Sequence, residues 1–223
     1  MTFSKPEPGI ITEISAQRKF RNRVNVAIDG SFAFGLHMDL VLSEGLSKGV
    51  DITSEQIERL MEEDSFLKAR DKAFHFIGYR PRSIEEVKTR LSREYYSLET
   101  VERVIERLIE LGMLDDCKFA REFAEGRLRN RGYGPMRIRQ DLRQKGISPQ
   151  IIEAEISRAF EHTSPEDLAA KAAEKIFRRL SRFSDTHIRK KKLSDYLLRR
   201  GFSYDQMHLA FERMEQFVTE KQA

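Results

Sequence analysis

Arginine and lysine side chains gather in two stretches of this chain, and the chemistry that they offer is anion binding. Residues 127–145 contain seven Lys or Arg and one acid, and residues 171–200 contain eleven and three. Guanidinium groups bind carboxylates and phosphates through paired hydrogen bonds. Because the formal charge of the whole chain is only +4, these stretches predict local positive fields that attract an acidic partner or nucleic acid.

The candidate binding residues are cations from these two stretches and two arginines beside Pro81. They are Arg80, Arg82, Arg127, Arg131, Arg137, Arg139, Arg143, Lys145, Arg178, Arg182, Arg189, Lys190, Lys191 and Arg199. At helical spacing Arg139 and Arg143 share a face, with Arg131 one link away. The competing interpretation is a solvated helix surface with local ion pairs, such as Arg139 or Lys145 with Asp141.

Residues that support catalysis or metal binding do not form a convincing set. Asp115 and Asp116 are adjacent and precede a helical pattern, so we interpret them as helix caps. The histidines show no metal-ligand spacing, and the single Cys117 excludes an internal disulfide. Gly132–Pro135 lacks the preceding strand and the Lys-Ser/Thr ending of a phosphate-binding loop. We therefore expect no catalytic residue, metal or cofactor, and a metal-dependent nuclease is the least favoured alternative.

The elements that position these residues are predicted by a threefold repetition. Three leucines each lie six residues before a serine: Leu91, Leu142 and Leu197 before Ser97, Ser148 and Ser203. The leucines are 51 and 55 residues apart. Apolar residues at helical spacing surround each leucine, and the serines are good N-cap residues. Each repeat is therefore predicted to be a helix, a link, a second helix, a tight turn and a third helix.

Smaller signals within the repeats agree with this pattern. Gly146 and Gly201 follow a cation at the end of the second helix, where a left-handed residue terminates helices. In the first repeat Tyr95 occupies that position instead. The first helices align through alanines, namely Ala69, Ala120 and Ala172, each followed four residues later by another apolar residue.

The N-terminal region follows the alternating pattern of β-strands. Apolar residues alternate on both sides of Asp29-Gly30, which is a strong signal for a two-residue hairpin turn. Residues 10–15 contain enough β-branched residues to predict a third strand. Residues 38–43 predict a short helix, and Thr53 with Gln56 predicts a capping box for the helix that follows.

The predicted fold is mainly α, with tandem three-helix repeats forming an elongated curved array. A small N-terminal β-hairpin or three-stranded sheet precedes the repeats. The predicted domains are residues 1–64 for the N-terminal region, 65–114 for repeat 1, 115–163 for repeat 2 and 164–223 for repeat 3. No stretch resembles a membrane span or a signal peptide, and we expect a cytoplasmic monomer.

Several of these motifs resemble those of the RecX family of bacterial recombination regulators. The likeness lies in Arg80–Ser83, in Leu111–Asp116 leading to Phe119-Ala120, and in Gly134-Pro135 through Ile138 and Leu142 to Lys145-Gly146. The hairpin from Arg23 to Gly35 is similar to the front end of many members. The resemblance covers nearly the whole chain, and the third repeat fits only as a general helical pattern.

This resemblance implies an all-helical array of three-helix repeats that binds the RecA recombinase. Proteins of this family lodge in the groove of the RecA nucleoprotein filament and restrain its growth, strand exchange, ATP hydrolysis and the SOS response. They act as regulators and not as enzymes. The alternative that the residues leave open is a sequence-independent single-stranded nucleic-acid-binding protein, and single-stranded DNA is also a possible second partner within the main hypothesis.

Overall fold

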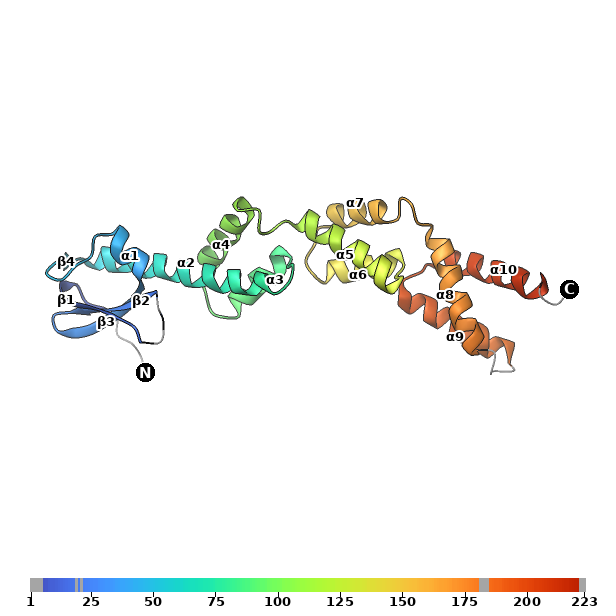
Figure 1. Ribbon diagram of the computed structural model, residues 1–223, viewed down its shortest axis with the longest axis horizontal. Helices are drawn as coiled ribbons and strands as arrows, with labels where there is room; N and C mark the ends of the chain where they lie inside the picture. The colour runs from blue at the N-terminus through green and yellow to red at the C-terminus, as the bar shows by residue number, and fades with distance from the viewer. Residues whose placement is uncertain (1–5, 19, 21, 181–184, 221–223) are drawn as a thin grey trace. The chain divides into compact units, whose positions relative to one another are not determined.

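The computed structural model describes residues 6–18, 20, 22–180 and 185–220, and it leaves out the side chains of residues 178, 186 and 213–220. Ten helices and four strands make up this described part (Figure 1). The chain divides into two compact units. The first contains residues 1–80 and 87–111, and the second contains residues 81–86 and 112–223.

An antiparallel sheet in the order β3-β2-β1-β4 forms the N-terminal end of the first unit. Its strands are β1 (Gly9–Ala16), β2 (Arg23–Ile28), β3 (Ser31–His37) and β4 (Asp51–Ile52). The predicted hairpin is confirmed, because Asp29 and Gly30 join β2 to β3 with φ of 47° and 80°. The three predicted strands are present as β1, β2 and β3, and the structure adds a fourth. Two residues pair with β1 as a fourth strand, and so short a pairing leaves no alternating pattern to detect.

A long helix joins this sheet to the first repeat. The predicted short helix is confirmed as α1 (Met38–Ser43), and α2 (Ser54–Gly78) then begins at the predicted Thr53–Gln56 capping box. Ile57 and Leu60 of α2 belong to the apolar core of the sheet. The predicted domain boundary at 64/65 therefore lies inside one continuous helix.

The three predicted helix trios are present. They are α2, α3 (Ile84–Ser92) and α4 (Leu98–Glu110); α5 (Asp116–Arg131), α6 (Pro135–Arg143) and α7 (Pro149–Ala159); and α8 (Pro165–Leu180), α9 (Thr186–Arg200) and α10 (Tyr204–Glu220). In each trio the first helix packs against the third: α2 against α4, α5 against α7 and α8 against α10. The repetition is confirmed, while the elongation and curvature of the array stay predictions.

The repeated residues play equivalent roles. Leu91, Leu142 and Leu197 are completely buried. Each of the three serines accepts a hydrogen bond from a backbone N–H three residues later, as an N-cap does. One alignment was wrong: the fully buried alanines of α8 are Ala169 and Ala173, whereas Ala172 is only half-buried.

The turn after each middle helix has the same handedness. Gly146 and Gly201 have φ of 75° and 87°, and Tyr95 takes the same left-handed conformation with φ of 64°. A tyrosine there is unusual, since a β-carbon disfavours positive φ. Its side chain is 95% exposed. Packing therefore does not explain the choice of residue.

No helix of the described residues is both long and apolar enough to cross a lipid bilayer.

Candidate partner-binding groove

The end of α9 meets the start of α6 through backbone hydrogen bonds. The N–H of Gly134 donates to the carbonyl of Arg200 at 2.8 Å, and the N–H of Met136 donates to that of Gly201 at 3.1 Å. The first amides of a helix and the last carbonyls of another both lack partners within their own helix. Their pairing satisfies both ends and places opposite helix-dipole charges together. We call this contact the second joint.

Glycine is required on both sides of the second joint. A β-carbon on Gly134 would lie 2.4 Å from the carbonyl oxygen of Gly201, and one on Gly201 would lie 2.2 Å from the backbone nitrogen of Arg137. Real β-carbons do not approach backbone atoms so closely. The two glycines therefore allow the backbones to touch, in addition to the left-handed turn that Gly201 supplies.

A related contact, which we call the first joint, lies between residues 81–86 and the end of α6. The hydroxyl of Ser83 donates to the carbonyl of Lys145 at 2.7 Å. The Lys145 ammonium lies 2.9 Å from a carboxylate oxygen of Glu86. A β-carbon on Gly146 would lie 2.4 Å from Cβ of Glu85. Equivalent positions of the repeats thus form both joints.

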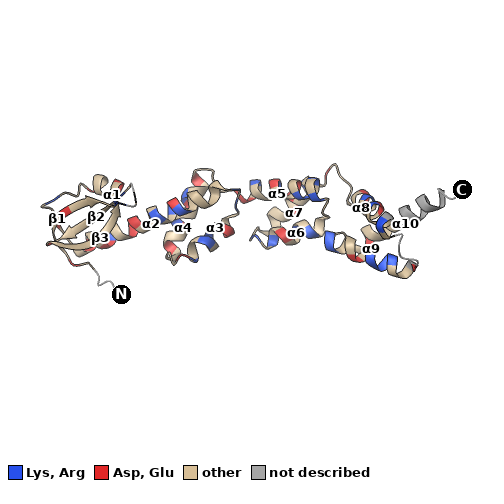
Figure 2. Ribbon diagram, turned by 60° about the horizontal axis from the view of Figure 1, so that its bottom comes forward, with Lys and Arg blue, Asp and Glu red and all other residues tan. Residues whose placement is uncertain are grey.

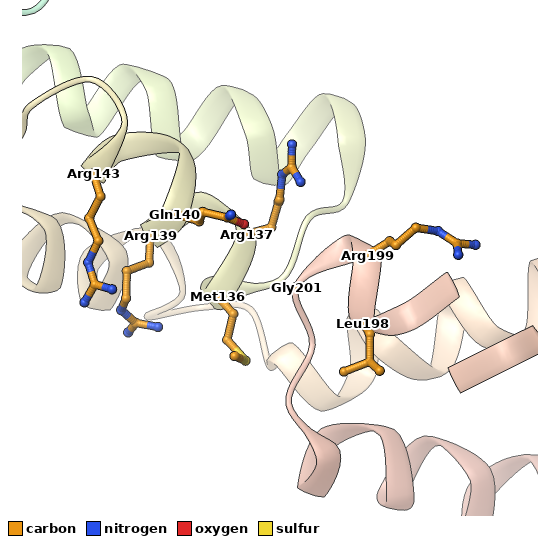
Figure 3. A pocket seen from close by; sticks show the side chains of 8 residues that line it. All are labelled: Met136, Arg137, Arg139, Gln140, Arg143, Leu198, Arg199 and Gly201. Atoms are coloured by element: carbon orange, nitrogen blue, oxygen red, sulfur yellow. The ribbon is translucent and has the colours of Figure 1, made fainter. Parts of the chain in front are cut away.

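A groove of about 470 Å³ lies at the second joint, and we call it the α6–α9 groove. It is lined by Met136, Arg137, Arg139, Gln140, Arg143, Leu198, Arg199 and Gly201 (Figure 3). Figure 3 shows Arg139 and Arg143 leaving α6 on the same side as Met136, while Arg137 leaves on the other side. This agrees with helical geometry, because Arg139 and Arg143 follow Met136 by three and seven residues and such residues share a helix face.

Two arginines near the groove share one carboxylate. Nε of Arg137 lies 3.0 Å from Oδ1 of Asp141, and Nε of Arg127 lies 3.8 Å from Oδ2. Asp141 therefore forms local ion pairs, as the competing interpretation held, but with Arg137 and Arg127 in place of Arg139 or Lys145. Asp141 lies one turn after Arg137 on α6, so the pair with Arg137 follows from helix geometry.

Arg139 pairs instead with Glu153 on α7. Its Nε and a terminal nitrogen each donate to one carboxylate oxygen at 2.7 Å. These hydrogen bonds raise the pKa of Arg139 and lower that of Glu153, and the charge of Arg143 lowers the latter further. Arg143 and Arg199 themselves make no ion pair with a residue that the structure describes. The groove therefore keeps excess positive charge.

Other candidate cations hold the fold together. Lys145 pairs with Glu86 and lies over the rings of Phe119 and Phe123. Arg127 lies over the Phe123 ring, with 4.7 Å between its guanidinium carbon and the ring centroid. These contacts anchor both side chains inside the second unit, and neither lines the α6–α9 groove.

The remaining candidates lie outside the groove. Arg80 is exposed in the first unit and Arg82 is half-buried in the second. Arg131 ends α5, where its carbonyl accepts a hydrogen bond from Arg200. Along α9, where Lys and Arg positions recur in Figure 2, lie Arg189, Lys190 and Lys191. The side chain of Arg178 and the whole of Arg182 lie outside the described residues.

Both aspartates cap helices, as predicted, but only Asp115 caps the helix that follows them in the chain. Asp115 accepts from the N–H of Lys118 and caps α5. Asp116 accepts from the N–H of Ile84 at 3.0 Å and thereby caps α3. Burial raises the pKa of Asp116. Within the described residues, no cluster of three or more His, Cys, Asp or Glu is arranged to hold a metal ion.

Sequence reasoning missed the uncharged part of the groove. Met136 is 52% exposed and Leu198 is 36% exposed, and Gln140 lies beside them. Met136 is detectable in the sequence, because it stands three and seven residues before Arg139 and Arg143. Leu198 gives no such signal, since its place beside α6 depends on the second joint.

Family models match four successive parts of the chain. Residues 9–53 match the model described as regulatory protein RecX N-terminal domain. Residues 69–108, 115–155 and 165–210 match the first, second and third three-helix domains of RecX. The matches follow the order of the sheet and the three repeats.

Proteins with similar sequences and structures are also named regulatory protein RecX. A regulatory protein RecX from Clostridium acetobutylicum is 32% identical over 203 residues, covering 90% of this chain and 94% of that protein. One from Halalkalibacterium halodurans is 32% identical and covers 91% of this chain and 77% of its own length. A solved structure titled as the crystal structure of regulatory protein RecX is 27% identical, with a TM-score of 0.69 over 91% of this chain and 98% of that one.

Proposed function

This chain belongs to the RecX family of regulatory proteins, and from that premise we propose that it binds the RecA nucleoprotein filament and restrains it. Its effect on ATP hydrolysis, strand exchange and the SOS-linked activities of RecA comes from binding, without chemistry of its own. The protein works as a cytoplasmic monomer in DNA repair and homologous recombination.

The observation that carries this proposal is the α6–α9 groove. Arg143 and Arg199 lack an ion pair within the described chain, and Arg139 has only an exposed one. Unpaired surface arginines with donors in a planar fork bind carboxylates and phosphates of a partner. They lie on helices whose ends are connected by backbone hydrogen bonds at the second joint. This preorganisation favours binding, because less conformational entropy is lost when a partner binds.

A titration of RecA ATPase activity tests this function. RecA is assembled on single-stranded DNA with ATP, and the protein is added in increasing amounts. We expect ATP hydrolysis to fall with concentration towards a plateau. An unchanged rate at protein concentrations well above that of RecA would contradict the proposal.

The alternative function is direct, sequence-independent binding of single-stranded DNA. The same arginines favour it, because phosphate contacts need only positive charge. Fluorescence anisotropy with a labelled oligonucleotide in the absence of RecA separates the two. Tight binding that weakens steeply with salt, together with unaltered RecA ATPase activity, would favour the alternative.

A further inference from the structure

One side of the α6–α9 groove combines positive charge with exposed aliphatic surface. Met136, Arg139 and Arg143 leave the same side of α6, and Leu198 of α9 lies across the groove from them (Figure 3). Met136 and Leu198 are 52% and 36% exposed. Apolar side chains at the centre of a charged groove gain free energy when a partner covers them.

The two joints differ in charge at equivalent positions. Counted from the buried leucine of each middle helix, Glu86 and Lys145 of the first joint correspond to Arg137 and Arg200 of the second. The first joint therefore contains an ion pair at 2.9 Å. The second has a cation at both positions: Arg137 pairs with Asp141, and Arg200 donates to the carbonyl of Arg131. The carboxylate that neutralises the first joint has no counterpart at this position of the second.

The acid that pairs with a groove arginine is open to solvent. Glu153 binds Arg139, but the Glu153 side chain is 53% exposed. The pair has two hydrogen bonds, and the carboxylate of a partner can form the same two hydrogen bonds with the guanidinium group. An incoming carboxylate can therefore take the place of Glu153 on Arg139 and reach Arg143 one turn further along α6.

The lining favours a peptide over a nucleic acid. Proteins that hold single-stranded nucleic acid stack bases on aromatic side chains. The residues that line the groove include no aromatic side chain. The nearby Tyr133 packs against the core of repeat 2 and lies under Arg127 and Arg137. Methionine and leucine instead suit a flexible aliphatic side chain.

We propose that the α6–α9 groove binds an acidic peptide segment whose aliphatic side chain sits between Met136 and Leu198 while its carboxylates pair with Arg139 and Arg143. The inference rests on the proposed function, and it names the chemistry of the partner segment at this site. An apolar residue with carboxylates beside it matches both the exposed aliphatic surface of Met136 and Leu198 and the charge of Arg139 and Arg143 (Figure 3).

A labelled peptide tests the charged half of this proposal. The probe is a short fluorescein-labelled peptide with glutamates around a central leucine, and binding to the full chain is measured by anisotropy. Replacing Arg139 and Arg143 together by alanine is expected to weaken binding at least about tenfold, the scale of lost charge-assisted hydrogen bonds. The matched control is Lys171→Ala with Lys175→Ala on α8, two exposed cations outside the groove whose removal changes the net charge equally. An equal loss in both double variants would overturn the proposal.

A double-mutant cycle tests the apolar half. Met136→Ser is combined with a peptide in which serine replaces the central leucine. Each change alone is expected to weaken binding several-fold, and the two together little more than either. Additive losses would show that the leucine does not contact Met136 and would contradict the proposed seating.

A short oligothymidylate of the same net charge separates the two classes of partner. We expect it to bind more weakly than the peptide and with no response to Met136→Ser. Tighter binding of the oligonucleotide, lost in the Arg139 and Arg143 double variant, would overturn the peptide proposal.

If the chain slows RecA ATPase activity but does not bind the peptide, only this inference fails. If the chain leaves RecA unaffected, the proposed function itself fails.

Discussion

At the scale of single residues, Asp64 shows how a buried charge connects two elements of the first unit. Its side chain is 4% exposed, accepts two hydrogen bonds from Arg23 of β2 and one from the backbone N–H of His37, and pairs with Lys68. Burial opposes its ionisation, but the hydrogen bonds and charges of Arg23 and Lys68 prevail and lower its pKa. The hydrogen bonds of Asp64 therefore connect α2 to the sheet.

Replacing Asp64 by asparagine tests that connection. We expect a loss of roughly 2–4 kcal/mol at neutral pH, because Arg23, whose side chain is only 14% exposed, loses its charged partner. A lowered pKa contributes stability above the unfolded value of about 3.9, and this contribution is lost as pH falls towards the folded value. The difference in unfolding free energy between wild type and variant should shrink below pH about 4. Urea titrations followed by circular dichroism measure it, and a difference that stays constant down to pH about 3 would contradict the assignment.

At the scale of elements, the joints explain why glycines follow the middle helices of repeats 2 and 3. The left-handed turn was predictable, because glycine after a terminal cation is a common helix ending. The requirement for a residue without a side chain at position 201 was not predictable from the sequence. It comes from the close approach of Gly201 to Arg137, which lies 64 residues earlier in the chain. Local sequence patterns predict backbone conformation, but they do not predict contacts between residues so far apart in the chain.

Gly201→Ala separates the steric requirement from the conformational one. Gly112 is the matched control: it also has positive φ, 66°, but a β-carbon there would meet no atom within 4 Å. Both variants carry the cost of a left-handed alanine, about 1–2 kcal/mol. Gly201→Ala should cost about 1–3 kcal/mol more, because the second joint must open. The comparison uses urea unfolding midpoints, and equal losses would mean that the joint adapts to the extra carbon.

The same distinction explains which parts of the candidate site were predictable. Arg137, Arg139, Arg143 and Arg199 were named from charge alone and line one groove. Lys145 was named for the same reason, yet it pairs with Glu86, 59 residues away. Charge runs show where cations are dense. They do not show which cations the fold uses for itself, because the acids that pair with them come from other helices.

At the scale of the whole molecule, one three-helix design recurs while its surface chemistry changes. The buried leucines, serine caps and left-handed turns are shared by all three repeats. The sheet and the repeats were therefore largely predictable from periodicity and turn residues. The exchange of an ion pair at the first joint for two arginines at the second is one such change in surface chemistry between neighbouring repeats.

The most direct test of this account replaces Arg137, Arg139 and Arg143 by alanine together and measures inhibition of RecA ATPase activity over a range of salt concentrations. We expect weaker inhibition and a flatter dependence on salt, because fewer charges are neutralised on binding. Circular dichroism should show unchanged helical content, since all three side chains are at least partly exposed and the buried residues of α6 are Ile138 and Leu142. Inhibition equal to that of the wild type at every salt concentration would contradict the central claim that this basic groove is the docking surface.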